Sequence, residues 1–334
     1  MAKRAIYMVS IAGQNISSRI APMLISLRIV DNEGTHSDTA EIVLDDSNGM
    51  IALPRDGDPM IVALGWEGGG LAEVFVGTVD EVRSNGSRGG GRELHISGKG
   101  MDTKGKCKEG QQMHADNATV GDVLNKAGKK AGISVQVDPS FASVKREWWG
   151  LNDESFIHFG ERTARELGGV FKVQGNKAIL AKKGGGSVSG AAMSVTVGSW
   201  GLNLISWDIM PFTGRPRHKS VRARYYDKKE AKWKETEAQV QDQGAQSVLL
   251  DRYSRADEGE AKGSADNGAR ESEKEKGGGS ASIDGSASAR AGGTFILVGT
   301  RAGVDGAYRI ETVTHNYTRS GWTTDLSLKQ PQGG

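Results

Sequence analysis

The sequence predicts a mainly β, β-rich α+β protein in which two related antiparallel β-barrel domains flank a small α+β module. Short β-branched runs separated by turn residues occur in both end portions of the chain, whereas helical spacing is concentrated in the middle. One hairpin pattern also occurs twice, at residues 73–97 and 304–328. Each copy has a glycine, a strand with a Thr-Val centre, a polar tip and a closing strand. The two centres are Thr78-Val79 and Thr312-Val313. We interpret the two hairpins as copies of one unit.

The first β-barrel domain is predicted over residues 1–103. Clusters of Asn, Gly, Asp and Ser separate its four opening β-branched runs, IYMVSIAG, MLISLRIVD, DTAEIVLDD and DPMIVALGW. Short strands with tight connections are typical of an antiparallel sheet that closes on itself. Pro54 and Pro59 bracket a turn that suits the entry to an edge strand. The first hairpin then completes the domain.

The α+β module is predicted over residues 104–184. Thr119 and Asp122 have the spacing of a capping box, and the apolar residues that follow lie on one helical face up to Gly132: Val120, Val123, Leu124 and Ala127. A strand, ISVQVD, comes next. We expect Asn152 or Asp153 to cap a second helix that ends at Gly168-Gly169, with an apolar face of Phe156, Phe159, Thr163, Ala164 and Leu167. Gly175-Asn176 then predicts a two-residue hairpin turn.

The second β-barrel domain is predicted over residues 185–334. The composition of KKGGGSVSGAA indicates a linker, after which β signals resume in MSVTVG, LISWDIM and SVRARYYDKK. Residues 255–276 are charged and almost free of large apolar side chains, so we expect a solvated helix or a loop there. SASIDG, TFILVGT and the second hairpin complete the domain.

Bulk composition excludes several kinds of partner. The 334 residues include 43 basic and 41 acidic side chains, and this balance gives no overall field for nucleic acid or an anionic membrane. The single cysteine, Cys107, favours a reducing compartment. No stretch approaches the ~20 apolar residues of a membrane span. We therefore expect a product that first folds in the cytoplasm and does not insert into a membrane.

We predict no catalytic, cofactor-binding or metal-binding residue and no cofactor. The histidines are too scattered in the sequence to show the spacing of metal ligands. They stand at positions 36, 95, 114, 158, 218 and 315. The glycine runs lack phosphate-loop spacing. Carboxylates such as Asp45-Asp46 leave a glycosidase pair open, because such partners need only converge in space. We assign Asp153-Glu154 to the first turn of a helix, where acids suit the dipole.

Two aromatic stretches invite a binding role. The segment from Arg215 to Lys234 interleaves cations with Tyr225, Tyr226 and Trp233, as single-stranded nucleic-acid sites do. The solvated outer face of an antiparallel strand is the favoured explanation. Trp148-Trp149 could anchor a partner, although packing within its own module is favoured.

Two stretches resemble the phage late control gene D protein family. The first runs from Trp149 to Lys183 and carries Asn152, Glu154-Ser155, Phe159, Arg162, Ala164 and Leu167-Gly168 before a hairpin. The second is similar to that family's closing hairpin, with Gly306-Ala307-Tyr308-Arg309-Ile310, Thr312-Val313-Thr314-His315 and Thr323-Thr324-Asp325-Leu326-Ser327-Leu328. Phe156, Gly160 and Thr163 depart from the family pattern, which has an acid and two leucines.

The resemblance implies a baseplate hub of a contractile tail, similar also to the N-terminal part of VgrG proteins. Such a hub is a homotrimer whose barrels make a pseudo-six-fold ring with a channel for DNA or an effector. The implied partners are a trimeric spike protein, the tail tube or its initiator protein, and other baseplate proteins, without sequence-specific nucleic-acid binding. The implied location is the virion tail baseplate, assembled in the host cytoplasm.

Phosphates bind cationic walls, so a channel for DNA constrains where cations lie. We expect Arg217, Lys219, Arg222 and Arg224 to face outward or toward a protein neighbour. The alternative functions are a cell-wall-degrading tail enzyme, which requires convergent acids in a concave site, and a carbohydrate-binding tail protein, which requires exposed aromatics in a groove.

Overall fold

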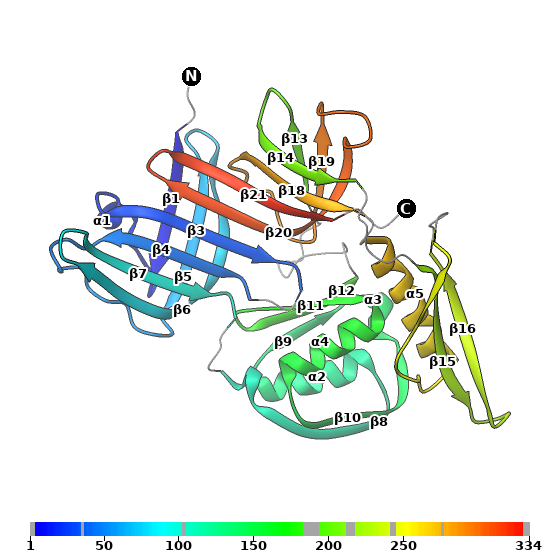
Figure 1. Ribbon diagram of the computed structural model, residues 1–334. Helices are drawn as coiled ribbons and strands as arrows, with labels where there is room; N and C mark the ends of the chain where they lie inside the picture. Colours follow the sequence, from blue (N-terminus) through cyan, green and yellow to red (C-terminus); the bar gives the residue numbers. More distant parts are fainter. Residues whose placement is uncertain are drawn as a thin grey trace.

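The computed structural model describes residues 4–34, 37–101, 105–182, 194–211, 218–240, 245–274 and 277–329. Figure 1 shows a β-rich chain in which sheets from both ends of the sequence lie together and a helix-containing module packs beside them. The predicted β-rich α+β class is therefore confirmed. No helix in these ranges is long and apolar enough to cross a membrane.

The first β unit, residues 4–101, is a curved antiparallel sheet whose pairing order is β1-β5-β6-β7-β4-β3. A two-residue strand β2 (Gln14–Asn15) and a short helix α1 (Ser17–Ile20) follow β1. Alternate residues of the strands point to one hydrophobic cluster, as the period of a half-buried strand requires. The sequence-predicted runs are its strands: β1 (Ala5–Ile11), β3 (Leu24–Asn32), β4 (Thr39–Asp45), β5 (Pro59–Trp66), β6 (Gly70–Ser87) and β7 (Gly91–Lys99).

The second β unit comprises residues 194–211 and 277–329, which form a sheet around a hydrophobic cluster of their own. Its last long strand pairs with β3, so both units belong to one 13-stranded sheet. Trp322 of this unit packs in the core of the first, and Trp66 of the first donates its indole N–H to the carbonyl of Gly285 at 2.8 Å. The strands are β13 (Val195–Ser199), β14 (Leu204–Met210), β18 (Gly278–Asp284), β19 (Thr294–Val298), β20 (Gly306–Thr318) and β21 (Gly321–Lys329).

The α+β module, residues 105–182, packs helices against sheets, as expected. The predicted capping box at Thr119 and Asp122 starts the first long helix, and Gly132 ends it with a positive φ of 73°. Gly168 ends the second long helix in the same way, with φ 69°. The elements are η1 (Lys106–Lys108), β8 (Gly110–Thr119), α2 (Val120–Ala131), β9 (Ser134–Val137), α3 (Pro139–Ala142), β10 (Lys145–Ser155), α4 (Phe156–Leu167), β11 (Gly169–Gln174) and β12 (Lys177–Lys182).

The predicted cap of the second helix was wrong. Ser155, rather than Asn152 or Asp153, caps α4 by accepting the backbone N–H of His158, because β10 continues through residue 155. Asp153 and Glu154 therefore precede the helix, and their assignment to its first turn was also wrong. The predicted apolar face is confirmed for Phe156 and Phe159, which are fully buried.

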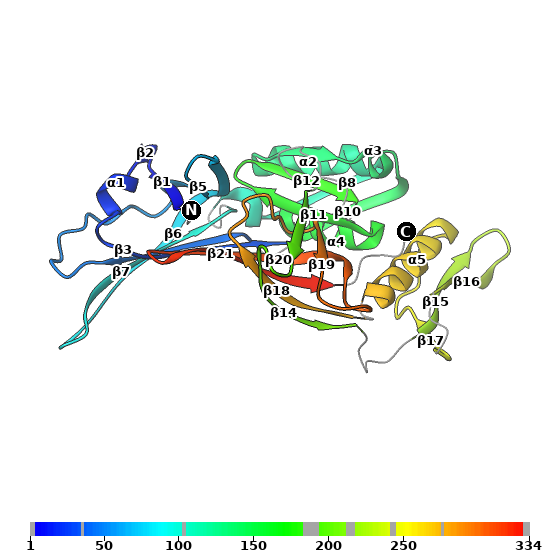
Figure 2. The ribbon, with the colours of Figure 1, turned by 90° about the horizontal axis from the view of Figure 1, so that it is seen from above.

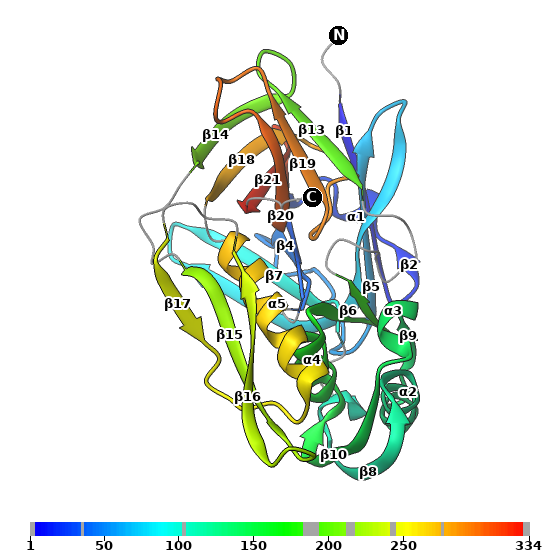
Figure 3. The ribbon, with the colours of Figure 1, turned by 90° about the vertical axis from the view of Figure 1, so that its right-hand side faces the viewer.

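Residues 218–274 form a separate layer: a sheet of β15 (His218–Asp227), β16 (Lys232–Gln239) and β17 (Ser247–Leu250), covered by helix α5 (Glu258–Lys274). Figure 3 shows α5 between this sheet and α4. The charged segment is thus a helix, as one of the two alternatives held, but it is not solvated all round. Ala261, Ala265 and Ala269 are buried, since small side chains allow α5 to lie close to the sheet.

The division into domains 1–103, 104–184 and 185–334 stays a proposal. Strand pairing links the first and last of these, while residues 218–274 have hydrophobic clusters of their own. The predicted linker falls largely on residues 183–193, which lie outside the described residues.

Candidate functional site: the duplicated β unit

The two β units have the same strand order. In the first unit the order is β1-β5-β6-β7-β4-β3, and in the second it is β13-β19-β20-β21-β18-β14. When the six strands of each unit are numbered along the chain, without the two-residue β2, both sheets have the order first, fourth, fifth, sixth, third, second. The outermost pair alone among these differs in direction, since β1 and β5 are antiparallel whereas β13 and β19 are parallel. The expectation of two related β units is therefore supported by topology.

The pairing register is also the same. Between β6 and β7 the register shifts from Val79 to Glu81, and between β20 and β21 it shifts from Ile310 to Thr312. A second shift, from Leu24 to Ser26 between β3 and β4, has its equivalent at Leu204 to Ser206 between β14 and β18. Bulges are local features of the backbone, so two at matching places make coincidence a poor explanation.

These bulges correct one detail of the sequence comparison. Glu81, not Thr78, is equivalent to Thr312, because each is the first paired residue after the bulge. Thr78 is equivalent to Arg309, which pairs with Lys329 as Thr78 pairs with Lys99. The match of Thr78-Val79 to Thr312-Val313 was thus displaced by three residues, since it followed residue type, whereas register follows the ladder.

An ion pair recurs at the shared bulge. Asp80 lies in the bulge of the first hairpin and contacts the Lys99 ammonium at 2.7 Å. Glu311 lies in the bulge of the second and contacts the Lys329 ammonium at 2.5 Å. The same charges on equivalent strands indicate that the duplication extends to side chains.

Strands β3 and β20 join the two units, with Ser26–Asn32 opposite Thr312–Thr318. Leu27 and Ile29 of β3 are each 1% exposed. His315 of β20 is fully buried, its Nδ1 is 3.0 Å from the hydroxyl of Thr324, and burial lowers its pKa to about 4. Beyond the strand, the Arg319 guanidinium donates to the carbonyls of Leu24 and Pro22.

A buried charge cluster ties this junction to the α+β module. The Lys172 ammonium of β11 lies 2.6 Å from Asp31 and 3.0 Å from Asp38. Burial, and then the charge of Asp31, raises the pKa of Asp38 to about 6. Burial alone would raise the pKa of Asp31 too, but Lys172 and the amide of Ala291 together lower it. Asp31 thus contacts the module and the second β unit at once.

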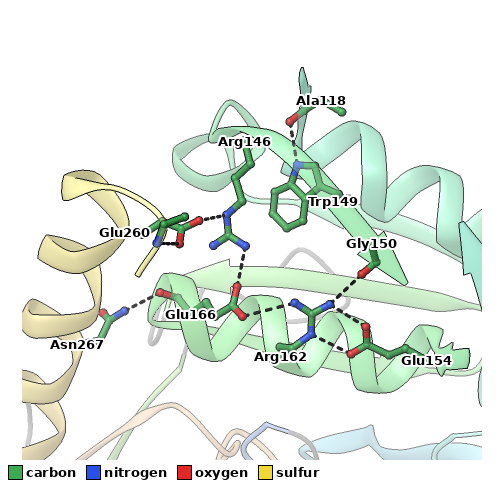
Figure 4. Close-up of polar contacts among 10 residues, drawn as sticks. Ala118, Arg146, Trp149, Gly150, Glu154, Arg162, Glu166, Glu260 and Asn267 are labelled. Carbon is green, nitrogen blue, oxygen red and sulfur yellow. Dashed lines mark hydrogen bonds and ion pairs between the residues drawn. The ribbon is translucent and has the colours of Figure 1, made fainter. Parts of the chain in front are cut away.

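Figure 4 shows a second polar network, on α4. The Arg162 guanidinium holds Glu154 with two hydrogen bonds of 2.9 and 2.7 Å. Arg146 lies 2.8 Å from Glu166 of α4 and 2.6 Å from Glu260 of α5. This network explains why the Glu154 and Arg162 residues of the motif matter structurally: they fix α4 against β10, and Arg146 then fixes α5.

From His218 onward, the basic aromatic segment forms β15, the central strand of its sheet, and the start of β16, and its cations lie on the solvated outer face, as favoured. Arg222 of β15 pairs with Glu235 and Glu237, and Arg224 lies over the ring of Trp233 at 5.9 Å. Their neighbours Val221 and Ala223 are buried beneath α5, so outward cations alternate with inward apolar side chains along β15. Lys219 is exposed on the same strand. Arg217 lies outside the described residues.

Trp148 and Trp149 differ in burial. Trp149 is buried and donates its indole N–H to the carbonyl of Ala118, so packing within the module is confirmed for it. Trp148 is 63% exposed.

Within the described residues, no group of three or more His, Cys, Asp or Glu side chains has the geometry of a metal site. His36 lies outside these residues. Asp45 and Asp46 line a cavity of about 380 Å³ in the first β unit, together with Arg19 and Met50. Hydrogen bonds from Ser47 lower the pKa of Asp45, which makes it a poor proton donor.

Comparisons with known proteins connect this architecture to phage tails. No protein-family model matches the chain. The probable baseplate hub protein of Escherichia phage 186 is 28% identical over 178 residues, covering 53% of this chain and 45% of that protein. That of Escherichia phage P2 is 28% identical over 180 residues, covering 54% and 46%. The chain therefore matches about half the length of these curated relatives.

Solved structures show the fold. A 43 kDa tail protein of prophage MuSo2 from Shewanella oneidensis superposes with a TM-score of 0.74 at 13% identity, covering 98% of this chain and 99% of that one. An Escherichia coli component of the type VI secretion system superposes with a TM-score of 0.60 at 10% identity, covering 97% and 77%. The resemblance found in the sequence is confirmed: the chain is similar in sequence to the baseplate hub proteins of phages P2 and 186 and in fold to phage tail and type VI secretion proteins.

Proposed function

We propose that the chain is a structural baseplate hub protein of a contractile phage tail or a related tail-like particle, located in the tail baseplate. The sequence relatives named as probable baseplate hub proteins support this role. We propose that it works through shape and symmetry, without catalysis of its own.

The observation that carries the proposal is the duplicated β unit with its shared order and register. Two similar units in one chain allow three chains to present six similar units around an axis. We propose such a homotrimeric ring, which joins a six-fold tail tube to a trimeric spike and leaves a channel for DNA or an effector. Other baseplate proteins bind its periphery.

The placement of cations agrees with a channel. Lys219, Arg222 and Arg224 lie on the β15 layer, outside the two β units that form the proposed ring. Figure 2 shows this layer at the opposite end of the molecule from the β6–β7 hairpin. We propose that these cations face outward or toward a protein neighbour, because phosphates would bind them in a channel wall.

The test is the mass of the native chain by light scattering, followed by negative-stain imaging. A trimeric ring with a central opening is the expected result. A monomer at every concentration that also clears a peptidoglycan suspension would contradict the proposal and favour a cell-wall-degrading enzyme.

A further inference from the structure

Among the strand edges that have a pairing partner on one side only, within the described residues, two are related by the duplication. The first is the β14 edge, Ser206–Met210, because β14 pairs with β18 and stands at the end of the sheet. The second is the β6 edge, Val82–Ser87, which pairs with β7 after β5 has ended its pairing at Thr78. Figure 3 places β14 at the outer margin of the second unit, and Figure 2 shows the β6–β7 hairpin extending away from the first.

The duplication relates these edges to a junction that the chain already makes. The shared bulges make β14 equivalent to β3, with Ser206 at the place of Ser26. They also make β6 equivalent to β20, with Ser87 at the place of Thr318. Because β3 pairs with β20 inside the chain, the β14 edge and the β6 edge are the two halves of a second such junction.

Side chains at the internal junction are more buried than their equivalents on the two open edges, as expected if those edges await a partner strand. Leu27 of β3 is 1% exposed beside β20, whereas its equivalent Trp207 on the β14 edge is half-buried. His315 of β20 is fully buried beside β3, whereas its equivalent Ser84 on the β6 edge is exposed. Met210, at the end of the β14 edge, is 56% exposed. Both edges thus leave open what the internal junction covers.

Six strands separate the two edges in the sheet of one chain (β18, β21, β20, β3, β4 and β7), so the partner of each edge is a second copy. We propose that the β14 edge of one copy pairs antiparallel with the β6 edge of the next, in the register of the internal junction. The cross-copy pairs are Met210 with Arg83, Ile209 with Ser84, Asp208 with Asn85, Trp207 with Gly86, and Ser206 with Ser87. The number of copies, three, rests on the proposed function.

Side chains at this interface are compatible with the register. Trp207 faces Gly86, which has no side chain, so the indole of one copy lies over the backbone of the other. Arg88 is equivalent to Arg319, which donates to the carbonyls of Pro22 and Leu24 across the internal junction. In the next copy the equivalent carbonyls are those of Leu202 and Leu204, and Arg88 is exposed and available to reach them.

The interface is heterologous, since different surfaces of the two copies meet, and such contacts build either closed rings or open filaments. Proline at 211 has no N–H to donate, so the ladder ends at that position. The proposed pairing is therefore short, and side-chain contacts such as that of Arg88 add to it.

Cysteine cross-linking tests the register. In the internal junction the N–H of Glu33 donates to the carbonyl of Glu311, so the alternate pair Arg28 with Asn316 is not hydrogen-bonded and has close Cα atoms suited to a disulfide. The equivalent cross-copy pair is Asp208 with Asn85. The double variant D208C/N85C of the full chain, mildly oxidised, should give covalent dimers and trimers on a non-reducing gel. The native Cys107 is buried and does not compete.

Two control double variants and one further test, with its own control, accompany it. R28C/N316C should link within one chain and stay at the monomer mass, which reports that the geometry permits a disulfide. M210C/N85C places the thiols two residues out of register, and we expect about tenfold less cross-linking because the Cα atoms are then too far apart. R88A should weaken association of the copies, whereas D116N, an exposed change on β8, should not.

The outcomes separate the two proposals. A ladder of linked species that stops at the trimer supports both the interface and the ring. A ladder that continues supports the interface and overturns a ring of three. Trimers by light scattering with no D208C/N85C cross-link overturn the interface but leave the hub proposal. Monomers without cross-links overturn both.

Discussion

Asp38 and His315 are buried titratable residues whose effects on stability are predicted to oppose each other. Burial raises the pKa of Asp38 from 3.8 to about 6, so between these values the folded protein holds a proton that the unfolded chain releases. Protonated Asp38 therefore contributes stability that is fully present below about pH 3.8 and is lost as the pH rises through about 6.

His315 has the opposite sign. Burial lowers its pKa from 6.5 to about 4, so between these pH values His315 is protonated in the unfolded chain and neutral in the folded protein. Its contribution is fully present above about pH 6.5 and is lost as the pH falls through about 4. At about 1.4 kcal/mol for each pKa unit, each residue is worth on the order of 3 kcal/mol across this window.

The contributions of Asp38 and His315 to the free energy of unfolding should therefore cancel in the native chain, and their sum should change little between pH 4 and 6.5. Asp38→Asn should lose on the order of 3 kcal/mol on acidification across that range, because His315 then acts alone. His315→Gln should instead gain a similar amount. Asp31 has a lowered pKa and acts mainly below this window.

Urea unfolding followed by circular dichroism, at one protein concentration and several pH values, measures these differences. Asp116→Asn changes an exposed carboxylate and should keep the native profile. If Asp38→Asn and His315→Gln both followed the native profile, the assignment of buried, shifted pKa values to these residues would be refuted.

Two further predictions concern α4 and α5. Gly160→Ala should destabilise the protein by about 1–3 kcal/mol in urea unfolding, because the added Cβ would lie 2.3 Å from the Phe171 ring. Its counterpart Gly263→Ala in α5 meets open space and should stabilise by about 0.5–1 kcal/mol through helix propensity, so equal effects of the two would contradict the packing. Arg162→Ala should cost about 2 kcal/mol, since Glu154, whose side chain is 11% exposed, loses its two-hydrogen-bond partner. Thermal melting with Arg165→Ala as the exposed control measures this cost, and equal melting temperatures would count against the network.

Local signals in the sequence were sufficient for many elements. In the capping box, the side chains of Thr119 and Asp122 each accept a backbone N–H of the other residue, so the start of helix α2 was predictable from residue types alone. The turn at Gly175-Asn176 was predictable for a similar reason, because two residues connect Gln174 to Lys177. These features depend on atoms only a few residues apart.

The cap of α4 was missed because three capping residue types occur in a row before the helix. Asn152, Asp153 and Ser155 could each accept the first helical N–H groups. The pairing of β10 with β8 decides among them, since it resumes at Glu154 and Ser155 after an irregularity and keeps them extended. The positive φ of 52° at Asp153 belongs to that irregularity. This choice depends on a partner strand some 40 residues away, which no local pattern specifies.

The extent of the duplication was also hidden in the sequence. Across the equivalent strands β6 and β20, identity is confined to positions such as Val82 with Val313 and Asn85 with Asn316. The pairing register preserves the relation, because a slip by one residue would turn every buried side chain outward. The junction of β3 with β20 joins residues about 280 positions apart, and it was not predictable from patterning.

The internal junction also bears on how an assembly forms. Because β3 and β20 are parts of one polypeptide, they meet at an effective concentration fixed by the chain, whatever the amount of protein in the cell. In a ring of six units, every second seam would be completed as each chain folds. The remaining seams would then respond to protein concentration and to the arrival of a spike or tube, and assembly would be timed by those seams alone.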